Sequence, residues 1–352
     1  MNKISFQNIR IAGISGAVPK TIINNLKEHQ FISLEEREKT VKLSGIKEYR
    51  KASSDQCTSD LCQASAEKLF KEMGIKPDSI DGIIFVTQTP DYLLPATACL
   101  LQNKLGCPQT TLAFDVNLGC SGFVFGLYIA CSFIQSGSLK RMLLLVGDTQ
   151  TKLCYGEDKN VVFLLGDAGT ASIIEFSPRS PEIRMKFMTD GSRHDKLIVP
   201  GGGFRIPSSK ETRKVKKQAD GLTRSDEHIY MDGMEIFNFS IIDVVKTMKE
   251  FMEEENLEIE DTDYLILHQA NKFMTDKIAK KLSFPPEKVL YSLDVYGNTS
   301  SASIPLTIVH CFSKMENKGN KRCLLSGFGV GLSWGVVDIT LEDICCPQVI
   351  EL

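Results

Sequence analysis

The sequence lacks the features that mark several common classes of protein. No apolar run reaches the roughly 18 residues that a membrane-spanning helix needs. The N-terminal stretch, MNKISFQNIRIAGISG, has no charged segment followed by an apolar segment and a small-residue cleavage site, as a signal peptide would. A net charge of −3 also differs from the basic character of domains that bind nucleic acid. We therefore expect a cytoplasmic protein without a membrane or nucleic-acid partner.

Common catalytic and metal-binding motifs are also missing. The chain has no Cys-x-x-Cys pair, His-Glu-x-x-His motif, Walker loop or Gly-x-Ser-x-Gly elbow. We expect no metal site and no bound cofactor. The 11 cysteines are scattered, and most are expected to be buried, unreactive thiols in a reducing compartment. The question is whether one of them differs from the rest.

Strand-like and helix-like segments alternate along the chain, which predicts an α/β fold. With 352 residues, 42% hydrophobic and 24% charged, the composition is ordinary for an enzyme of one large domain or two similar ones. Strands are predicted at 9–18, 81–90, 111–117 and 141–148, helices at 58–73, 97–106 and 121–137, and a hairpin-like pair at 161–176.

The second half of the chain repeats the element order of the first. An internal repeat this long predicts two halves related by a pseudo-twofold axis, with right-handed crossovers and mostly parallel sheets. We place the halves at 1–180 and 231–352, with a connecting excursion at 181–230. The basic stretch 209–217 within it is expected to be a solvated loop. The corresponding segments are 81–106 and 263–282, the surroundings of Cys120 and 291–312, and 140–148 and 321–329.

Three polar residues follow predicted strands at equivalent places of the two halves. Cys120 lies between a strand and its helix, Asn298 lies at the matching place of the second half, and His268 ends the strand DYLIL. Ligand chemistry in open α/β sheets gathers at the carboxyl ends of strands and the N-termini of the following helices. If the halves are related by a pseudo-twofold axis, the three side chains meet in one pocket.

Cys120 is the strongest candidate for a nucleophile, in the stretch N-L-G-C-S-G-F. Gly119 and Gly122 permit a tight turn and close substrate approach, and a helix N-terminus favours the thiolate. The alternative is one more buried cysteine that packs beneath a helix, and the spacing alone leaves the two about equally supported.

The other two candidates also have structural alternatives. His268 would donate a hydrogen bond to a developing enolate oxygen, or be an imidazole whose hydrogen bonds are satisfied in the core. Asn298 would act beside His268 at that oxygen, or would cap a helix. The Gly-rich stretch 326–334 would present backbone N–H groups to an oxyanion, although this pattern alone is weak evidence.

Together these motifs resemble the β-ketoacyl-acyl-carrier-protein synthase III group of the thiolase superfamily. The resemblance covers most of the chain, in the family's order, and is specific because the motifs occur jointly. The matching stretches are D-V-N-L-G-C-S-G-F (115–123), G-D-A-G (166–169), H-Q-A-N (268–271), Y-G-N-T-S-S-A-S (296–303) and G-F-G-V-G-L-S-W-G (327–335).

The resemblance implies a thiolase-like duplicated fold in five αβαβα layers, a homodimer, and a Cys–His–Asn triad at Cys120, His268 and Asn298. It implies that Cys120 takes an acyl group from a thioester donor and that malonyl on an acyl carrier protein then enters. His268 and Asn298 would stabilise the enolate left by loss of carbon dioxide, and that carbanion would attack the acyl group. Backbone N–H groups of Cys120 and Val330 would bind the oxyanion, Val330 standing where the family usually has glycine.

The sequence departs from the family's pattern where substrates bind. Where the family typically has the Trp and Arg that hold the donor's adenine, this chain has Lys39 and Leu43. Where the family has a further donor-binding Arg, this chain has Lys159. The partner subunit's aromatic residue that closes the acyl pocket corresponds to Leu94, so a longer or branched acyl group is expected to fit. Phe273 stands where the family often has a basic residue that docks the carrier protein, whereas Lys280 and Lys281 match the family's basic residues. We expect a divergent member with an unusual or carrier-bound donor.

Three other readings remain at this stage. An acyltransferase on the same fold would pass the acyl group from Cys120 to a hydroxyl or amine, with His268 as general base. A non-catalytic scaffold would not need a reactive thiol. A non-decarboxylating thiolase commonly uses a second cysteine near the C-terminal glycines, but Cys323 precedes that motif and is expected to pack in a strand.

Overall fold

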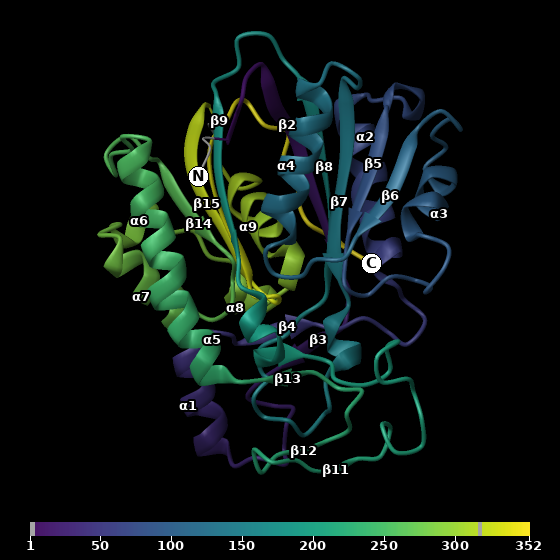
Figure 1. Ribbon diagram of the computed structural model, residues 1–352, viewed down its shortest axis with the longest axis vertical. Helices are drawn as coiled ribbons and strands as arrows, with labels where there is room; N and C mark the ends of the chain where they lie inside the picture. The colour runs from purple at the N-terminus through teal and green to yellow at the C-terminus, as the bar shows by residue number, and fades with distance from the viewer. Residues whose placement is uncertain (1–3, 316–318) are drawn as a thin grey trace.

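The computed structural model describes residues 4–315 and 319–352 and has two mixed β-sheets with helices between and outside them (Figure 1). One sheet has the order β17 (Ile350–Glu351), β2 (Ile9–Val18), β8 (Ala168–Phe176), β7 (Arg141–Asp148), β5 (Gly82–Val86) and β6 (Leu112–Val116). The other has the order β1 (Ile4–Phe6), β9 (Ile183–Thr189), β16 (Ser333–Leu341), β15 (Lys321–Gly329) and β14 (Tyr264–Leu267).

Helices complete five layers, which confirms the predicted αβαβα fold. The middle layer contains α4 (Gly122–Gln135) and α9 (Ser303–Phe312), whose apolar side chains form one core with both sheets (Figure 1). A second core lies between the six-stranded sheet and α2 and α3, and a third lies between the five-stranded sheet and α5 to α7. Their bounds are α2 (Thr58–Met73), α3 (Thr97–Lys104), α5 (Gly233–Phe239), α6 (Val245–Glu254) and α7 (Lys272–Lys281), with a π-helical turn at Ser240–Val244.

Strand β7 shows why the layers form. Its side chains alternate between the faces of the sheet, so Leu143 and Leu145 pack against α2 and α3 while Leu144 and Val146 pack against α4. All four are fully buried, which is the pattern expected for a strand covered on both faces. Asp148, the last residue of β7, is also fully buried.

Two predictions about the strands are wrong. Residues 161–176 do not form a hairpin, because 161–164 are turns and β8 alone pairs with β7 on one side and β2 on the other. The sheets are mixed, not mostly parallel: among the described strands of the five-stranded sheet, only β14 and β15 pair in parallel. One of the antiparallel pairs arises because β15 returns directly as β16, without a helical crossover.

The predicted excursion at 181–230 contains β9, which lies inside the five-stranded sheet, so the chain leaves the layered core only after Thr189. Beyond it, β10 (Leu197–Ile198) pairs with β13 (Tyr230–Met231), and β11 (Lys216–Lys217) pairs with β12 (Thr223–Arg224). The basic stretch 209–217 is exposed except at Thr212. The other strands and α-helices of the described residues are β3 (Ile22–Asn24), β4 (Glu48–Arg50), α1 (Leu34–Ser44) and α8 (Leu293–Tyr296). Across 4–315 and 319–352, no helix has the length and apolar character needed to cross a membrane.

Candidate active site

Cys120, His268 and Asn298 line one cavity of about 460 Å³, so the predicted convergence of the two halves is observed. Cys120 comes from the turn between β6 and α4, His268 from the end of β14, and Asn298 from the loop after α8. All three are buried, with exposed fractions of 7%, 2% and 8%. The described residues contain no group of three or more His, Cys, Asp or Glu placed to hold a metal ion.

Glycines let the backbone close around Cys120. A Cβ at Gly122 would lie 2.6 Å from Val86 Cγ1, so α4 starts in contact with β5. On the opposite side, a Cβ at Gly329 would lie 2.9 Å from Cys120 Sγ, and Gly329 has a φ of 155°. The Gly-rich stretch therefore lies against the sulfur because it carries no side chain there.

The pKa of the Cys120 thiol is raised to about 11, chiefly because the group is buried. The nearby Asp148 carboxylate raises this pKa further, whereas hydrogen bonds from Ser300 and from the backbone N–H groups of Val330 and Cys120 lower it. In the free protein, burial therefore opposes the thiolate that a helix N-terminus favours. The two backbone N–H groups nevertheless point at the sulfur, where the resemblance places the oxyanion site.

His268 is held as a neutral imidazole. Its Nδ1 lies 2.8 Å from Ser303 Oγ, and its ring meets the Phe328 ring edge-on at a centroid distance of 5.4 Å. Burial lowers the pKa of His268 to about 3, against a smaller opposing effect of a hydrogen bond with the Ser300 backbone. A neutral ring fixed in this way suits a hydrogen-bond donor and makes a weak base.

The backbone of Asn298 is fixed by the loop that contains the G-D-A-G motif. Asn298 N–H donates to the Leu164 carbonyl at 2.7 Å, and Gly166 N–H donates to the Asn298 carbonyl at 2.9 Å. A side chain at Gly166 would overlap the Tyr296 carbonyl, so this contact requires glycine. Asn298 Oδ1 accepts from Ser300 N–H at 2.9 Å, which leaves the Nδ2 group as the donor available to the cavity.

Sequence reasoning missed four polar residues around the triad. Ser303 contacts His268, and Gln150 Nε2 donates to Ser300 Oγ at 2.9 Å. Ser300 Oγ lies 4.0 Å from Cys120 Sγ, and the Asp148 carboxylate accepts from Ser301 Oγ at 2.6 Å. The available signals were the polar run S-S-A-S after Asn298 and the carboxylate that ends the otherwise apolar strand LLLVGD.

The cavity opens between α1, α5 and α7. Lys39, Leu43 and Phe273 line it, and Phe273 stacks on Phe237 at a centroid distance of 5.5 Å. Lys159 also lines it, but its ammonium lies 3.1 Å from the carboxylate of Glu36 on α1. The lysine that was predicted to contact the donor is therefore held in a half-exposed ion pair.

The other predicted substrate contacts lie away from this cavity. Lys280 and Lys281 are exposed on α7, and Lys281 donates to the Ile241 carbonyl at 3.1 Å, so neither lysine lines the cavity. Leu94 is 83% exposed and does not line the cavity of its own subunit.

Comparisons with known proteins agree with the geometry. The family described as 3-oxoacyl-[acyl-carrier-protein (ACP)] synthase III matches residues 114–191, and the family of its C-terminal part matches residues 252–341. A beta-ketoacyl-[acyl-carrier-protein] synthase III of Clostridium perfringens is 34% identical, over 95% of this chain and 100% of the relative. One of Streptococcus sanguinis is 37% identical, over 85% and 89%. The crystal structure of a 3-oxoacyl-(acyl-carrier protein) synthase from Burkholderia xenovorans superposes with a TM-score of 0.93 at 36% identity, covering 100% of this chain and 99% of that one.

Proposed function

The chain belongs to the 3-oxoacyl-[acyl-carrier-protein] synthase III family, and we propose that Cys120, His268 and Asn298 carry out its reaction. That reaction, which belongs to fatty acid biosynthesis, is the decarboxylative Claisen condensation of an acyl thioester with malonyl on an acyl carrier protein, and the enzyme is a transferase. The observation that carries the assignment of residues is their meeting in one buried cavity, although they come from both halves of the chain.

In the first stage, the Cys120 sulfur attacks the carbonyl of the acyl donor, and the donor's thiol leaves. The N–H groups of Val330 and Cys120 point at this sulfur and would hydrogen-bond the oxyanion that forms beside it. The acyl-enzyme divides one difficult carbon–carbon bond formation into two easier steps.

In the second stage, malonyl loses carbon dioxide and the resulting carbanion attacks the acyl-Cys120 carbonyl. The neutral His268 ring and the Nδ2 group of Asn298 would donate hydrogen bonds to the thioester oxygen as enolate charge develops. Burial lowers the pKa of His268 to about 3, so the ring is poorly suited to take a proton from an acceptor hydroxyl, which favours condensation over acyl transfer.

The donor and carrier contacts belong to the same proposal. Lys159 would meet the donor only after sharing or breaking its ion pair with Glu36, and Lys39 and Leu43 offer no planar stacking partner. Lys280 and Lys281 would act outside the cavity, on the acidic carrier protein. The acyl donor is a substrate, so no bound cofactor is needed, and a cytoplasmic location stays a prediction.

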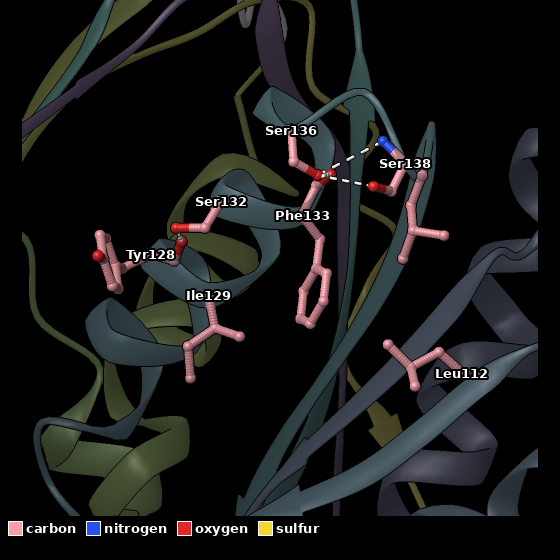
Figure 2. A pocket seen from close by; sticks show the side chains of 8 residues that line it. Leu112, Tyr128, Ile129, Ser132, Phe133, Ser136 and Ser138 are labelled. Atoms are coloured by element: carbon pink, nitrogen blue, oxygen red, sulfur yellow. Dashed lines mark hydrogen bonds between the residues drawn. The ribbon is translucent and has the colours of Figure 1, made fainter.

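A homodimer also remains a proposal, and the outer edge of the six-stranded sheet supports it. Strand β6 is an edge strand, and unpaired strand edges readily pair with another chain. Beside it, Leu112 and the α4 residues Tyr128, Ile129 and Phe133 line a largely apolar hollow of about 610 Å³ (Figure 2). Tyr92, Leu93 and Leu94 are exposed by 58%, 83% and 83%. A second copy would cover apolar groups and bring Leu94 to the neighbouring acyl pocket.

The experiment is to mix the enzyme, an acyl donor and malonyl-acyl-carrier-protein, and to measure carbon dioxide release and the 3-oxoacyl product together. We expect the two in equal amounts, and neither with Cys120→Ala. Release of acyl to a hydroxyl acceptor without carbon dioxide would contradict the proposal and support the acyltransferase reading.

A further inference from the structure

The cavity that contains the triad has a buried end and an exposed end. Cys120 and His268 line it where side chains are buried. Glu36 and Lys39 of α1, together with Lys159, line it where side chains are exposed to solvent. A thioester that reaches the Cys120 sulfur therefore has its reactive group at the buried end, and the group that carries the thioester lies at the exposed end.

One face of helix α1 forms part of the exposed end. Among the α1 residues that line the cavity are Glu36, Lys39, Thr40 and Leu43, which are spaced three or four positions apart, as residues on one helical face are. Glu38 is also exposed, but it does not line the cavity. A change of charge at Glu36 therefore acts at the exposed end, whereas the same change at Glu38 acts elsewhere on α1.

Two of the charged groups at the exposed end neutralise each other. The Lys159 ammonium lies 3.1 Å from Glu36 Oε1, and the two side chains are 51% and 47% exposed. Lys39 lines the cavity as well, and no ion pair within 4–315 and 319–352 includes it. The exposed end thus offers one unpaired cation to an incoming anionic group.

The two kinds of donor differ in the charge that they bring to this end. Coenzyme A and an acyl carrier protein both present the thioester on a pantetheine arm. In coenzyme A the arm continues into a nucleotide with a diphosphate and a further phosphate, and proteins bind such groups through several Lys or Arg side chains. In a carrier protein the arm ends in a single phosphodiester. One unpaired lysine matches the phosphodiester better than it matches the nucleotide.

We propose that Glu36 is a specificity-determining residue, which selects against a nucleotide-bearing donor by pairing with Lys159 at the exposed end of the cavity. The preferred donor is then an acyl group on a pantetheine arm that ends in one phosphodiester, as on a carrier protein. A half-exposed ion pair contributes little to stability, so its effect here is the negative charge that Glu36 places beside any phosphate that reaches Lys159. The inference rests on the proposed function, because it assumes that a thioester donor enters this cavity.

The test compares the binding of coenzyme A with that of pantetheine, which lacks the nucleotide. Calorimetry is done in a Cys120→Ala background, so that no thiol exchange occurs at this position. With Glu36 in place, the two affinities should agree within about threefold, because the nucleotide gains little. Glu36→Gln should bind coenzyme A about fivefold more tightly, with pantetheine unchanged. Added salt should reduce this gain, because it screens the freed charge of Lys159.

Two further variants serve as controls. Glu38→Gln removes the same charge from α1 outside the cavity and should leave the affinity for coenzyme A unchanged. The double variant Glu36→Gln with Lys159→Gln has neither charge of the ion pair, so it should bind coenzyme A about as the parent protein does.

The proposal is overturned if Glu36→Gln leaves the affinity for coenzyme A unchanged, or if it raises the affinity for pantetheine equally. It is also overturned if Glu38→Gln or the double variant shows the same gain, or if the parent protein binds coenzyme A more than about tenfold more tightly than pantetheine. The readout is binding without chemistry. A failure of the proposed function, seen as an absence of acylation at Cys120, is therefore a separate result.

Discussion

At the residue scale, the two hydrogen-bond donors contributed by the second half are separate from the nucleophile. His268 is fixed by Ser303, and Asn298 uses its Oδ1 to accept from Ser300 N–H. In the proposed mechanism, neither side chain takes part in the attack of Cys120 on the donor. We therefore expect His268→Ala and Asn298→Ala to retain acyl loading, while decarboxylation of malonyl falls about 100-fold or more. Single-turnover mass spectrometry and carbon dioxide release measure the two steps separately. Equal loss of both steps would contradict this division of roles.

The buried imidazole also predicts the pH dependence of condensation. A lowered pKa keeps His268 neutral below the usual value of 6.5, until the pH approaches about 3. Pre-acylated enzyme should therefore condense at a nearly constant rate from pH 8 to pH 5. An imidazole with an ordinary pKa would instead lose about 30-fold of its neutral form by pH 5. A pH–rate profile that falls around pH 6.5 would show that burial does not hold His268 neutral.

The sequence predicted Cys120, His268 and Asn298 because each lies in a recognisable motif; Cys120 and His268 also follow a strand, whereas Asn298 follows helix α8 and not the predicted strand. It did not predict the place of Asp148 beside the loop after Asn298, because that place depends on a contact with Ser301, 153 positions further along the chain. The thiol pKa was also missed. Local pattern shows the helix N-terminus beside Cys120, whereas burial, the larger effect, exists only in the folded protein.

At the scale of elements, the turn after β15 forms one wall of the nucleophile's site. A Cβ at Gly329 would lie 2.6 Å from Cys120 Cβ, closer than real Cβ atoms approach. Gly329→Ala should fold with a shifted turn and lose acyl loading by about 100-fold or more, since a displacement near 1 Å has an effect of this size. Gly156→Ala, with no atom within 4 Å of its added Cβ, is the control and should load normally. Normal loading by Gly329→Ala would mean that the turn does not shape the site.

Elements with strong periodicity or a fully apolar run were predicted well. The predicted helix 58–73 and strand 141–148 coincide with α2 and β7. The predicted hairpin at 161–176 failed because buried apolar residues, such as Val161 and Phe163, also occur in a turn, where Phe163 packs with Ile32. An apolar run indicates burial, and it does not by itself distinguish a strand from a buried turn.

At the scale of the whole molecule, the duplication was readable, whereas strand direction was not. Repeated order along the chain fixes the number of halves, but the sheets also exchange terminal strands: β1 pairs with β9, and β17 pairs with β2. Such pairings bring residues 4–6 to residues 183–185 and leave no local mark in the sequence. Antiparallel returns such as β15 to β16 likewise depend on tertiary pairing.

The proposed homodimer gives a prediction at this scale. Glutamates at Leu93 and Leu94 would put charges on the exposed apolar face beside β6. We expect light scattering to give a mass of twice 39.1 kDa for the wild type and 39.1 kDa for the double variant. Phe204→Glu, at a site that is 90% exposed on the excursion, should remain dimeric. A wild-type monomer, or an unaffected double variant, would contradict this interface.

The most direct test of the account is an acylation and chase experiment read by intact mass. Enzyme is exposed to a panel of acyl-coenzyme A and acyl-carrier-protein donors, and malonyl-acyl-carrier-protein is then added. We predict a gain of one acyl group, absent in Cys120→Ala, and a return to the unmodified mass as a 3-oxoacyl product appears. A donor panel that never acylates Cys120, or an acyl group that malonyl-acyl-carrier-protein does not remove, would contradict the account.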